Sequence, residues 1–405
     1  MAEGIVKARL WGSYSIDAAL VVAGLLVSYA VTRDPVHKYL SDEIEDLAVL
    51  GIVAYIIIVS SHLGSRFPVP VAVIELMLGM TLAIVGLKAT EPLDLLAGIG
   101  ANMVLFMAGA EIDLKLVRAW AGRVSILGLL SFAGPAIVAL AYSKLIGLDT
   151  GGTLILIAGF AATSAALAYS ILKSTGLLRL RAGQVALTAA MIADIAGIMF
   201  LSLATASIDP SLALYIVVII AVIGLQPLLP RISGAPFEAE IRLVAMAIII
   251  LGVLSEAIGV HSVLTSFLLG MVVSETVRSR RELREKLESL ATGFFTPFFF
   301  VASGMSVNAV LMLRELPIIV VISVLIVLSK FLPSYLYFRQ ALATRRRSSI
   351  IASSSLVPLL TVTIIAGEAG ISVGIISEQL YSIMIGIVIL TAVSSTIIAA
   401  AYMRR

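Results

Sequence analysis

Residues 182–206 read AGQVALTAAMIADIAGIMFLSLATA. This run is apolar and long enough to cross a membrane as one helix, and Asp194, near its middle, is its only ionisable residue. A carboxylate near the bilayer centre is energetically costly and usually marks an ion or proton pathway. We therefore predict that Asp194 binds a cation or a proton.

The composition of the whole chain is that of a membrane protein. Of its 405 residues, 60% are hydrophobic and 13% are charged, and the mean hydropathy is +1.10. Too few polar residues remain to cover the surface of a soluble domain. The chain has no cysteine, and His37, His62 and His261 are too scattered to form a metal site on their own. The sequence predicts an all-α polytopic membrane protein that needs no cofactor.

Apolar segments account for nearly the whole chain and predict about 13–14 transmembrane helices. They lie at about 12–31, 45–65, 69–88, 94–113, 122–146, 152–173, 182–206, 210–229, 239–258, 260–277, 287–307, 316–338, 347–369 and 376–403. About four-fifths of the lysines and arginines in loops and at the ends fall on one side of this topology. The bias places both termini in the cytoplasm, because basic residues collect there.

The first 44 residues are expected to form an extra N-terminal helix and an outer loop. Lys7 and Arg9 before the apolar run, and Ser28-Tyr29-Ala30 after it, also resemble a signal peptide with its cleavage site. We expect a retained helix, since an even number of spans keeps the C-terminus on the basic side.

Two span ends suggest an internal repeat. LFMAGAEID at 105–113 and FFFVASGMSVN at 298–308 share aromatic residues followed by a similar glycine motif, at Gly109 and Gly304. The charge-derived topology gives the two copies opposite orientations. We therefore predict inverted five-helix repeats at 69–206 and 260–403, joined by linking helices at 210–258, an arrangement typical of secondary transporters.

The same repeat places Ser164 opposite Leu359, which follows Pro358. FAATSAALAYS at 160–170 is rich in small and hydroxyl residues, whereas SSSLVPLLTVTII at 353–365 contains a proline that removes a backbone donor. We predict two crossed, broken helices, in which irregular backbone faces protein or a cavity. In the alternative, the hydroxyls bond back to their own helices and the proline only causes a kink.

Lys330, in VVISVLIVLSKFLPSYLYF, is the one basic residue at a depth comparable to that of Asp194. It lies too deep to reach water easily, so we expect it to act as a partner of the aspartate. A purely structural salt bridge between two helices is the alternative.

Other acidic residues are less distinctive. Glu75 could line an access funnel or could serve helix packing, while Glu111 and Asp113 close a span and are expected at the membrane interface. The chain has no H-E-x-x-H, no Gly-x-Ser-x-Gly, no P-loop lysine and no second mid-membrane aspartate, so we expect no enzymatic activity.

Several of these motifs together resemble the cation:proton antiporter-2 family of sodium(potassium)/proton antiporters. PVPVAVIELMLGM at 68–80 resembles an early family helix, and LLAGIGANMVLFMAGAEIDLKLVR at 95–118 resembles the next. GVHSVLTSFLLGMVVSE at 259–275 and PFFFVASGMSVN at 297–308 match later signatures. The resemblance covers about 45–405.

This resemblance implies a sodium/proton antiporter fold, a homodimer in the cell membrane and a role in pH homeostasis. It implies a core domain at about 94–206 and 316–403 within a membrane domain at 45–403. Among the site residues, it implies that Asp194 binds Na⁺ (or Li⁺ or K⁺) and protons in competition, and that Lys330 is the core basic residue. It also implies helix breaks, with Thr163 and Ser164 at the first, and Pro358 and Thr361 at the second.

Two departures from the family pattern bear on mechanism. Ala193 stands where relatives carry Asp, Asn or Gln, and Ala165 stands where many have proline. Lys330 could therefore pair with Asp194 itself. One membrane carboxylate predicts electroneutral exchange of one proton per cation; if Lys330 also loses its proton, exchange would be electrogenic. A cation channel or channel-like potassium efflux system, and an inactive or sensory relative, are the alternative functions.

Overall fold

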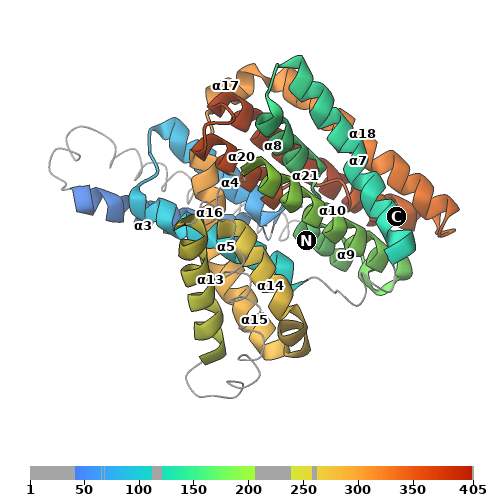
Figure 1. Ribbon diagram of the computed structural model, residues 1–405, viewed down its shortest axis with the longest axis horizontal. Helices are drawn as coiled ribbons and strands as arrows, with labels where there is room; N and C mark the ends of the chain where they lie inside the picture. Colours follow the sequence, from blue (N-terminus) through green and yellow to red (C-terminus); the bar gives the residue numbers. More distant parts are fainter. Residues whose placement is uncertain are drawn as a thin grey trace, which may run out of the picture. The chain divides into compact units, whose positions relative to one another are not determined.

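The computed structural model describes residues 42–64, 66–67, 69–111, 121–205, 239–257 and 262–403, and every regular element among them is a helix (Figure 1). The expected segments at 12–31 and 210–229, and Asp113, lie outside these residues, so the extra first helix remains a prediction. The helices are α3 (Asp42–Gly64), α4 (Val71–Val85), α5 (Glu91–Ala110), α7 (Ala121–Leu145), α8 (Thr150–Ala161), α9 (Ala165–Ser174), α10 (Arg181–Thr205), α13 (Ala239–Ala257), α14 (Ser262–Ser279), α15 (Arg281–Leu290), α16 (Thr296–Met305), α17 (Ala309–Arg314), α18 (Leu316–Gln340), α19 (Arg346–Ser354), α20 (Thr361–Ser372) and α21 (Glu378–Met403).

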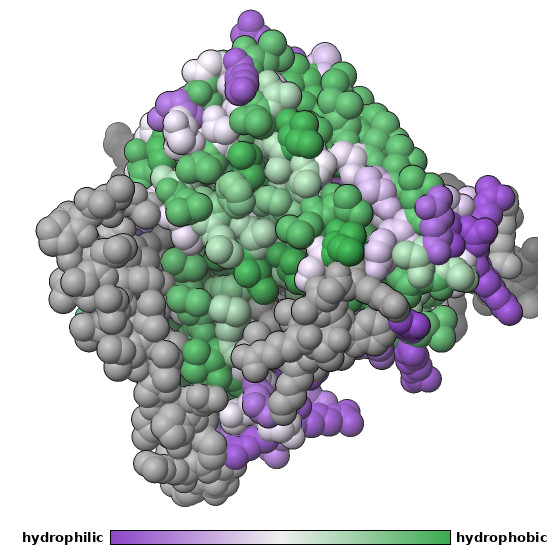
Figure 2. All heavy atoms as spheres, turned by 45° about the vertical axis from the view of Figure 1, so that its right-hand side comes forward, coloured by the Kyte–Doolittle hydropathy of each residue, from purple (hydrophilic) through white to green (hydrophobic). Residues whose placement is uncertain are grey.

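Seven spans in the described residues are long and apolar enough to cross a membrane, with α8 and α9 counted together as one. The others are α3, α5, α7, α10, α18 and α21, and the apolar helices α4 and α20 are shorter. Apolar side chains such as Ile126 of α7 and Val321 of α18 are exposed. Figure 2 shows hydrophobic side chains over much of one face, with hydrophilic ones at its margins. The protein is therefore a multi-pass membrane protein.

The apolar segment expected at 287–307 is helical as far as Met305, with a π-helical turn inside it. The charged helix α15 ends at Leu290, a π-helical turn spans Ala291–Phe295, and α16 begins at Thr296. Pro297 lies in the first turn of α16, directly after the π-helical turn. The helical run therefore continues from the charged α15 into the buried α16, and hydropathy does not register the π-helical turn between them.

The chain divides into two compact units. The smaller consists of Met1–Gly100 with Phe295–Ala309, and the larger consists of Ala101–Phe294 with Val310–Arg405. The described part of the smaller unit holds α3, α4, the first half of α5, and α16. The larger unit holds the second half of α5 and the remaining described helices, apart from α17, which begins at the boundary.

In the smaller unit, α4 crosses α16 at two glycines. A Cβ on Gly79 would strike the carbonyl oxygen of Val301, and a Cβ on Gly304 would strike that of Leu76. Only glycine permits so close an approach of two helix backbones. These two positions therefore bring the helices into direct backbone contact.

An equivalent crossing joins α5 to α14 in the larger unit. A Cβ on Gly109 would strike the carbonyl oxygen of Phe267, and a Cβ on Gly270 would strike that of Phe106. In both crossings each glycine meets the residue three positions before the glycine of the other helix. Gly109 and Gly304, which carry the sequence repeat, thus have the same packing role, and the inverted orientation of the repeats remains a prediction.

The rest of the larger unit is built around α7, α8 and α10, which pack against one another. α18 packs against α7, α19 and α21, and α8 also packs against α20 (Figure 1). The Thr363 hydroxyl donates to the carbonyl of Gly159 at 2.7 Å, across 204 positions of sequence. The core domain expected at about 94–206 and 316–403 remains a prediction, since this unit also holds α13, α14 and α15.

Candidate ion-binding site

The first predicted helix break is present between α8 and α9. α8 ends at Ala161, and residues 162–164 are not helical, with Ala162 at φ −56° and ψ 157°. Ser164 then caps α9, because its hydroxyl accepts a hydrogen bond from the Leu167 N–H at 3.4 Å. Two half-helices therefore meet at this point, with the C-terminal end of α8 and the N-terminal end of α9 close together.

The second predicted break, between α19 and α20, crosses the first. α19 ends at Ser354 and α20 begins at Thr361, with Pro358 in the non-helical residues between them. The Ser164 N–H donates to the Pro358 carbonyl at 2.9 Å, and the Thr163 hydroxyl donates to the Leu356 carbonyl at 3.3 Å. Each break therefore satisfies backbone groups that the other leaves free.

Asp194 lies on α10 and faces the start of α9. Its carboxylate accepts a hydrogen bond from the Ala165 N–H at 3.3 Å, it interacts with the backbone amide of Thr163, and it is 8% exposed. A helix N-terminus carries free N–H groups and a positive partial charge, so it favours an anion there. Gly197 permits the approach of α10, because a Cβ there would lie 2.7 Å from the Ala162 Cβ.

Lys330 lies on α18 and faces the end of α8. Its ammonium donates to the Ala162 carbonyl at 2.5 Å and to the Thr163 hydroxyl at 2.9 Å, and the side chain is fully buried. A cation at a helix C-terminus interacts favourably with the free carbonyls. Gly134 of α7 admits α18 at this level, since a Cβ there would lie 2.8 Å from the Ser329 carbonyl oxygen.

The two charged side chains therefore compensate opposite ends of the same break. The direct ion pair that the sequence left open is not formed: no ion pair within 4.0 Å joins Lys330 to Asp194 among the described residues. The two groups still interact electrostatically. Thr163, between them, bonds to the ammonium through its hydroxyl and contacts the carboxylate through its backbone.

Ala193, the departure next to the aspartate, takes no part in polar contacts of this site. It is fully buried and packs with Phe132 and Ala161 in a small apolar cluster, beside which Phe132 and Phe200 have ring centroids 5.3 Å apart. Asp194 is thus the carboxylate at the break, and Lys330 donates its hydrogen bonds to the break itself instead of to a side chain at position 193.

Thr391 was not predicted as a site residue. Its hydroxyl accepts a hydrogen bond from the Leu359 N–H at 3.4 Å, so it serves the second break as Asp194 serves the first. A threonine inside the apolar α21 is an ordinary helix residue by its pattern, and no signal in the sequence singles it out. Thr361 begins α20 and is 8% exposed.

The two acidic residues considered for access have different positions. Glu75 is 3% exposed and accepts a hydrogen bond from the Ser60 hydroxyl at 3.1 Å, which fits the packing role left open for it; a funnel role remains a prediction. Glu111 lines a cavity of about 170 Å³ in the larger unit, and its position at the membrane interface remains a prediction. The other lining residues are Tyr169, Gln184, Leu187, Thr188, Met191, Arg278 and Arg284.

A family model and curated relatives agree on the family to which the chain is similar. Residues 47–404 match the family model described as sodium/hydrogen exchanger, transmembrane. The chain is 26% identical to probable Na⁺/H⁺ antiporter 3 of Methanocaldococcus jannaschii, over 86% of this chain and 95% of that protein. It is 24% identical to the Na⁺/H⁺-K⁺ antiporter GerN of Bacillus cereus, over 82% of this chain and 89% of that protein.

A solved structure shares the fold. The structure of the sodium proton antiporter MjNhaP1 from Methanocaldococcus jannaschii superposes with a TM-score of 0.63, at 14% sequence identity. The match covers 89% of this chain and all of that one.

Proposed function

Because the chain belongs to the sodium/hydrogen exchanger family, we propose that it exchanges a monovalent cation for protons across a membrane by alternating access. The observation that carries this proposal is the position of Asp194, a buried carboxylate at the junction of two half-helices. Na⁺ is the expected cation, since related proteins are named as Na⁺/H⁺ antiporters, and GerN as an antiporter of K⁺ as well.

Competition at one carboxylate links the two transported ions. Ionised Asp194 attracts a cation, which hydroxyl and carbonyl oxygens of the break, including those of Thr163 and Ser164, would help to coordinate. Protonated Asp194 has no net charge and releases the cation. Since one group cannot hold both ions, each conformational change carries either the cation or the proton.

Lys330 is a positioning residue in this scheme. Its two hydrogen bonds to the break support a structural role, in which its ammonium keeps its protons through the cycle. Exchange is then electroneutral, with one proton moved per monovalent cation. We further propose a homodimer in the cell membrane with both termini in the cytoplasm, as the charge bias and the family resemblance indicate.

The central experiment measures exchange in proteoliposomes that contain a pH-sensitive dye. Addition of Na⁺ should change the internal pH with the wild type, Asp194→Asn should abolish the response, and Asp94→Asn, at an exposed position of α5, should preserve it. No response of the wild type to Na⁺, Li⁺ or K⁺, or full exchange by Asp194→Asn, would overturn the proposal. Currents at a fixed gradient without coupled proton movement would instead indicate a channel.

The pH dependence tests the competition directly. Protons and cation exclude each other at Asp194, so the apparent KM for Na⁺ should fall as pH rises, by about tenfold per unit while the carboxylate is mostly protonated. A KM that is independent of pH, with only the maximal rate changing, would contradict a shared site.

A further inference from the structure

The cavity lined by Glu111 lies on the same face of α10 as Asp194. Leu187 and Met191, both in its lining, precede Asp194 by seven and three positions. Residues at these spacings share one helix face. Met191 and Asp194 are therefore about one turn, or 5 Å, apart along the axis of α10. The cavity thus approaches the ion-binding carboxylate from one end of the helix.

Glu111 places a carboxylate in this cavity without a fixed partner. The residue follows the last turn of α5, and no hydrogen bond or ion pair within 4.0 Å to another described residue holds its side chain. It interacts electrostatically with Arg284 and Glu288 of α15 and with Asp194. A carboxylate that is partly buried and not hydrogen-bonded is costly, so a ligand that supplies positive charge would stabilise it.

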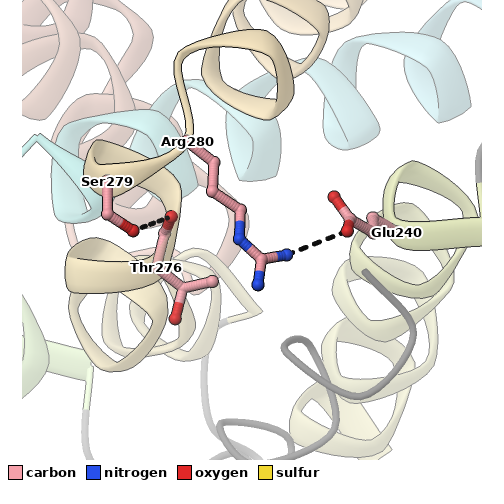
Figure 3. A network of polar contacts seen from close by, with 4 residues as sticks. All are labelled: Glu240, Thr276, Ser279 and Arg280. Carbon is pink, nitrogen blue, oxygen red and sulfur yellow. Dashed lines mark hydrogen bonds and ion pairs between the residues drawn. The ribbon is translucent and has the colours of Figure 1, made fainter. Parts of the chain in front are cut away.

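The arginines at the cavity come from either side of the corner between α14 and α15. Arg278 lies in the last turn of α14, and Arg284 lies in the first half of α15. Arg280, at the corner, is held elsewhere: its guanidinium donates to Glu240 of α13 at 2.9 Å (Figure 3). The Ser279 hydroxyl also donates to the Thr276 carbonyl at 3.0 Å (Figure 3). The Arg280–Glu240 pair ties the corner to α13, while Arg278 and Arg284 on either side of it line the cavity.

We propose that Glu111 is a second cation-binding residue, which receives the monovalent cation in this cavity before it reaches Asp194, with Arg284 as the competing counter-charge. The inference rests on the proposed exchange function and extends it with a second binding residue on the path of the cation. The cation approaches Glu111, weakens its attraction to Arg284, and then moves along the α10 face past Met191 to the vacant carboxylate of Asp194.

The two side chains have opposite expected effects on cation affinity. Removal of the Glu111 charge takes away an attraction for the cation, whereas removal of the Arg284 charge takes away a repulsion and a competitor. Disruption of the fold would impair both variants alike. Opposite shifts in KM therefore distinguish an electrostatic role in binding from a structural one.

The first experiment measures the electrostatic potential in the cavity by thiol labelling and does not depend on transport. The chain has no cysteine, so Gln184→Cys introduces a single thiol at a residue that lines the cavity and is exposed. The ratio of its reaction rates with a cationic and an anionic methanethiosulfonate reports the local potential. Glu111→Gln should lower this ratio by about fivefold, since one unit charge within a few ångströms is removed. Arg284→Gln should raise it.

A matched control removes the same charge from α15, next to Arg284. Glu285 of α15 is exposed and pairs with Arg281 at 2.6 Å, away from the cavity lining. Glu285→Gln should leave the rate ratio within about twofold of the parent, because a solvated charge is screened. An unchanged ratio in Glu111→Gln, or an equal fall in Glu285→Gln, would overturn the inference.

The second experiment measures Na⁺-driven proton exchange in proteoliposomes as a function of Na⁺ concentration. Glu111→Gln should raise the KM about fivefold with the maximal rate nearly kept, Arg284→Gln should lower the KM, and Glu111→Asp should stay close to wild type. A KM unaffected by Glu111→Gln would overturn the inference even if the labelling ratio shifts. If the wild type shows no exchange, the proposed function fails, and the labelling ratio still decides whether Glu111 sets the potential in the cavity.

Discussion

The two helix breaks of the larger unit have the same construction but are completed by different chemistry. In the first, at residues 162–164, Lys330 meets the end of one half-helix and Asp194 meets the start of the next. In the second, at 355–360, the neutral hydroxyl of Thr391 meets a backbone N–H. The comparison supports the proposal that the cation binds at the first break and that the second has a supporting role.

The physical reason lies in the partial charges of helix ends. The free carbonyls of α8 attract a cation and the free N–H groups of α9 attract an anion, so one lysine and one aspartate each occupy a favourable end. The second break bonds to backbone and hydroxyl groups of the first, through Pro358 and Leu356. A charged group is therefore needed only where the cation binds, and the substitutions below test this asymmetry.

Replacement of Lys330 should have the largest effect. Lys330→Met leaves the Ala162 carbonyl and the Thr163 hydroxyl without their buried donor. We expect a loss of about 3 kcal/mol in stability, together with a large loss of exchange. Thermal unfolding in detergent and dye-monitored exchange measure the two effects, and Lys144→Met, at an exposed end of α7, should change neither.

Lys330→Met also tests how much net charge moves across the membrane in each transport cycle. If Lys330 keeps its protons through the cycle, residual exchange by Lys330→Met should remain insensitive to a clamped membrane potential, as in the wild type. A wild type that responds to the potential, and a variant that does not, would show that Lys330 itself releases a proton.

Much of this site could be predicted because its signals are local in sequence. Asp194 and Lys330 stand out against apolar runs, and Ser164 and Pro358 are residues that cap or interrupt helices. The position of both breaks follows from such residue types. Hydropathy alone also located most of the described helices to within a few residues.

The contacts that could not be predicted from the sequence are those that depend on which helix faces pack together. Lys330 bonds to the Ala162 carbonyl, a group that every residue possesses and that no pattern marks as free. Glu111 lines a cavity because α5 ends beside α10 and α15. Its position at the end of an apolar segment does not reveal which helices lie beside it. The glycine pairs behave alike: Gly109 and Gly304 were visible as a repeat, but their partners, Gly270 and Gly79, emerge only from the packing.

The close approach of α10 to the first break gives the next prediction. A side chain at Gly197 would collide with Ala162, since a Cβ alone would lie 2.7 Å from the Ala162 Cβ. Gly197→Val should therefore cost about 2 kcal/mol and move Asp194 away from α9, with loss of exchange. Gly51→Val is the matched control, because nothing lies within 4 Å of a Cβ there, and its stability should stay within about 0.5 kcal/mol of wild type.

Thr163 tests the polar link within the first break. Thr163→Val keeps the shape but removes the acceptor for Lys330 and the donor to the Leu356 carbonyl. We expect a cost of about 1–2 kcal/mol and reduced exchange, because two buried groups lose a partner. Thr163→Ser retains the hydroxyl and should recover most of both. Equal behaviour of the two variants in unfolding and exchange assays would mean that the hydroxyl has no role.

The smallest effect is expected at the second break, and it completes the comparison. Thr391→Val removes the acceptor of the Leu359 N–H, a neutral hydrogen bond worth about 1 kcal/mol, and removes no charge. Stability should fall by that amount, while the KM for Na⁺ and its pH dependence should stay as in the wild type, with Thr391→Ser as the control. A shift in KM as large as that of an Asp194 variant would show that the cation contacts both breaks, and the division of roles between them would then be wrong.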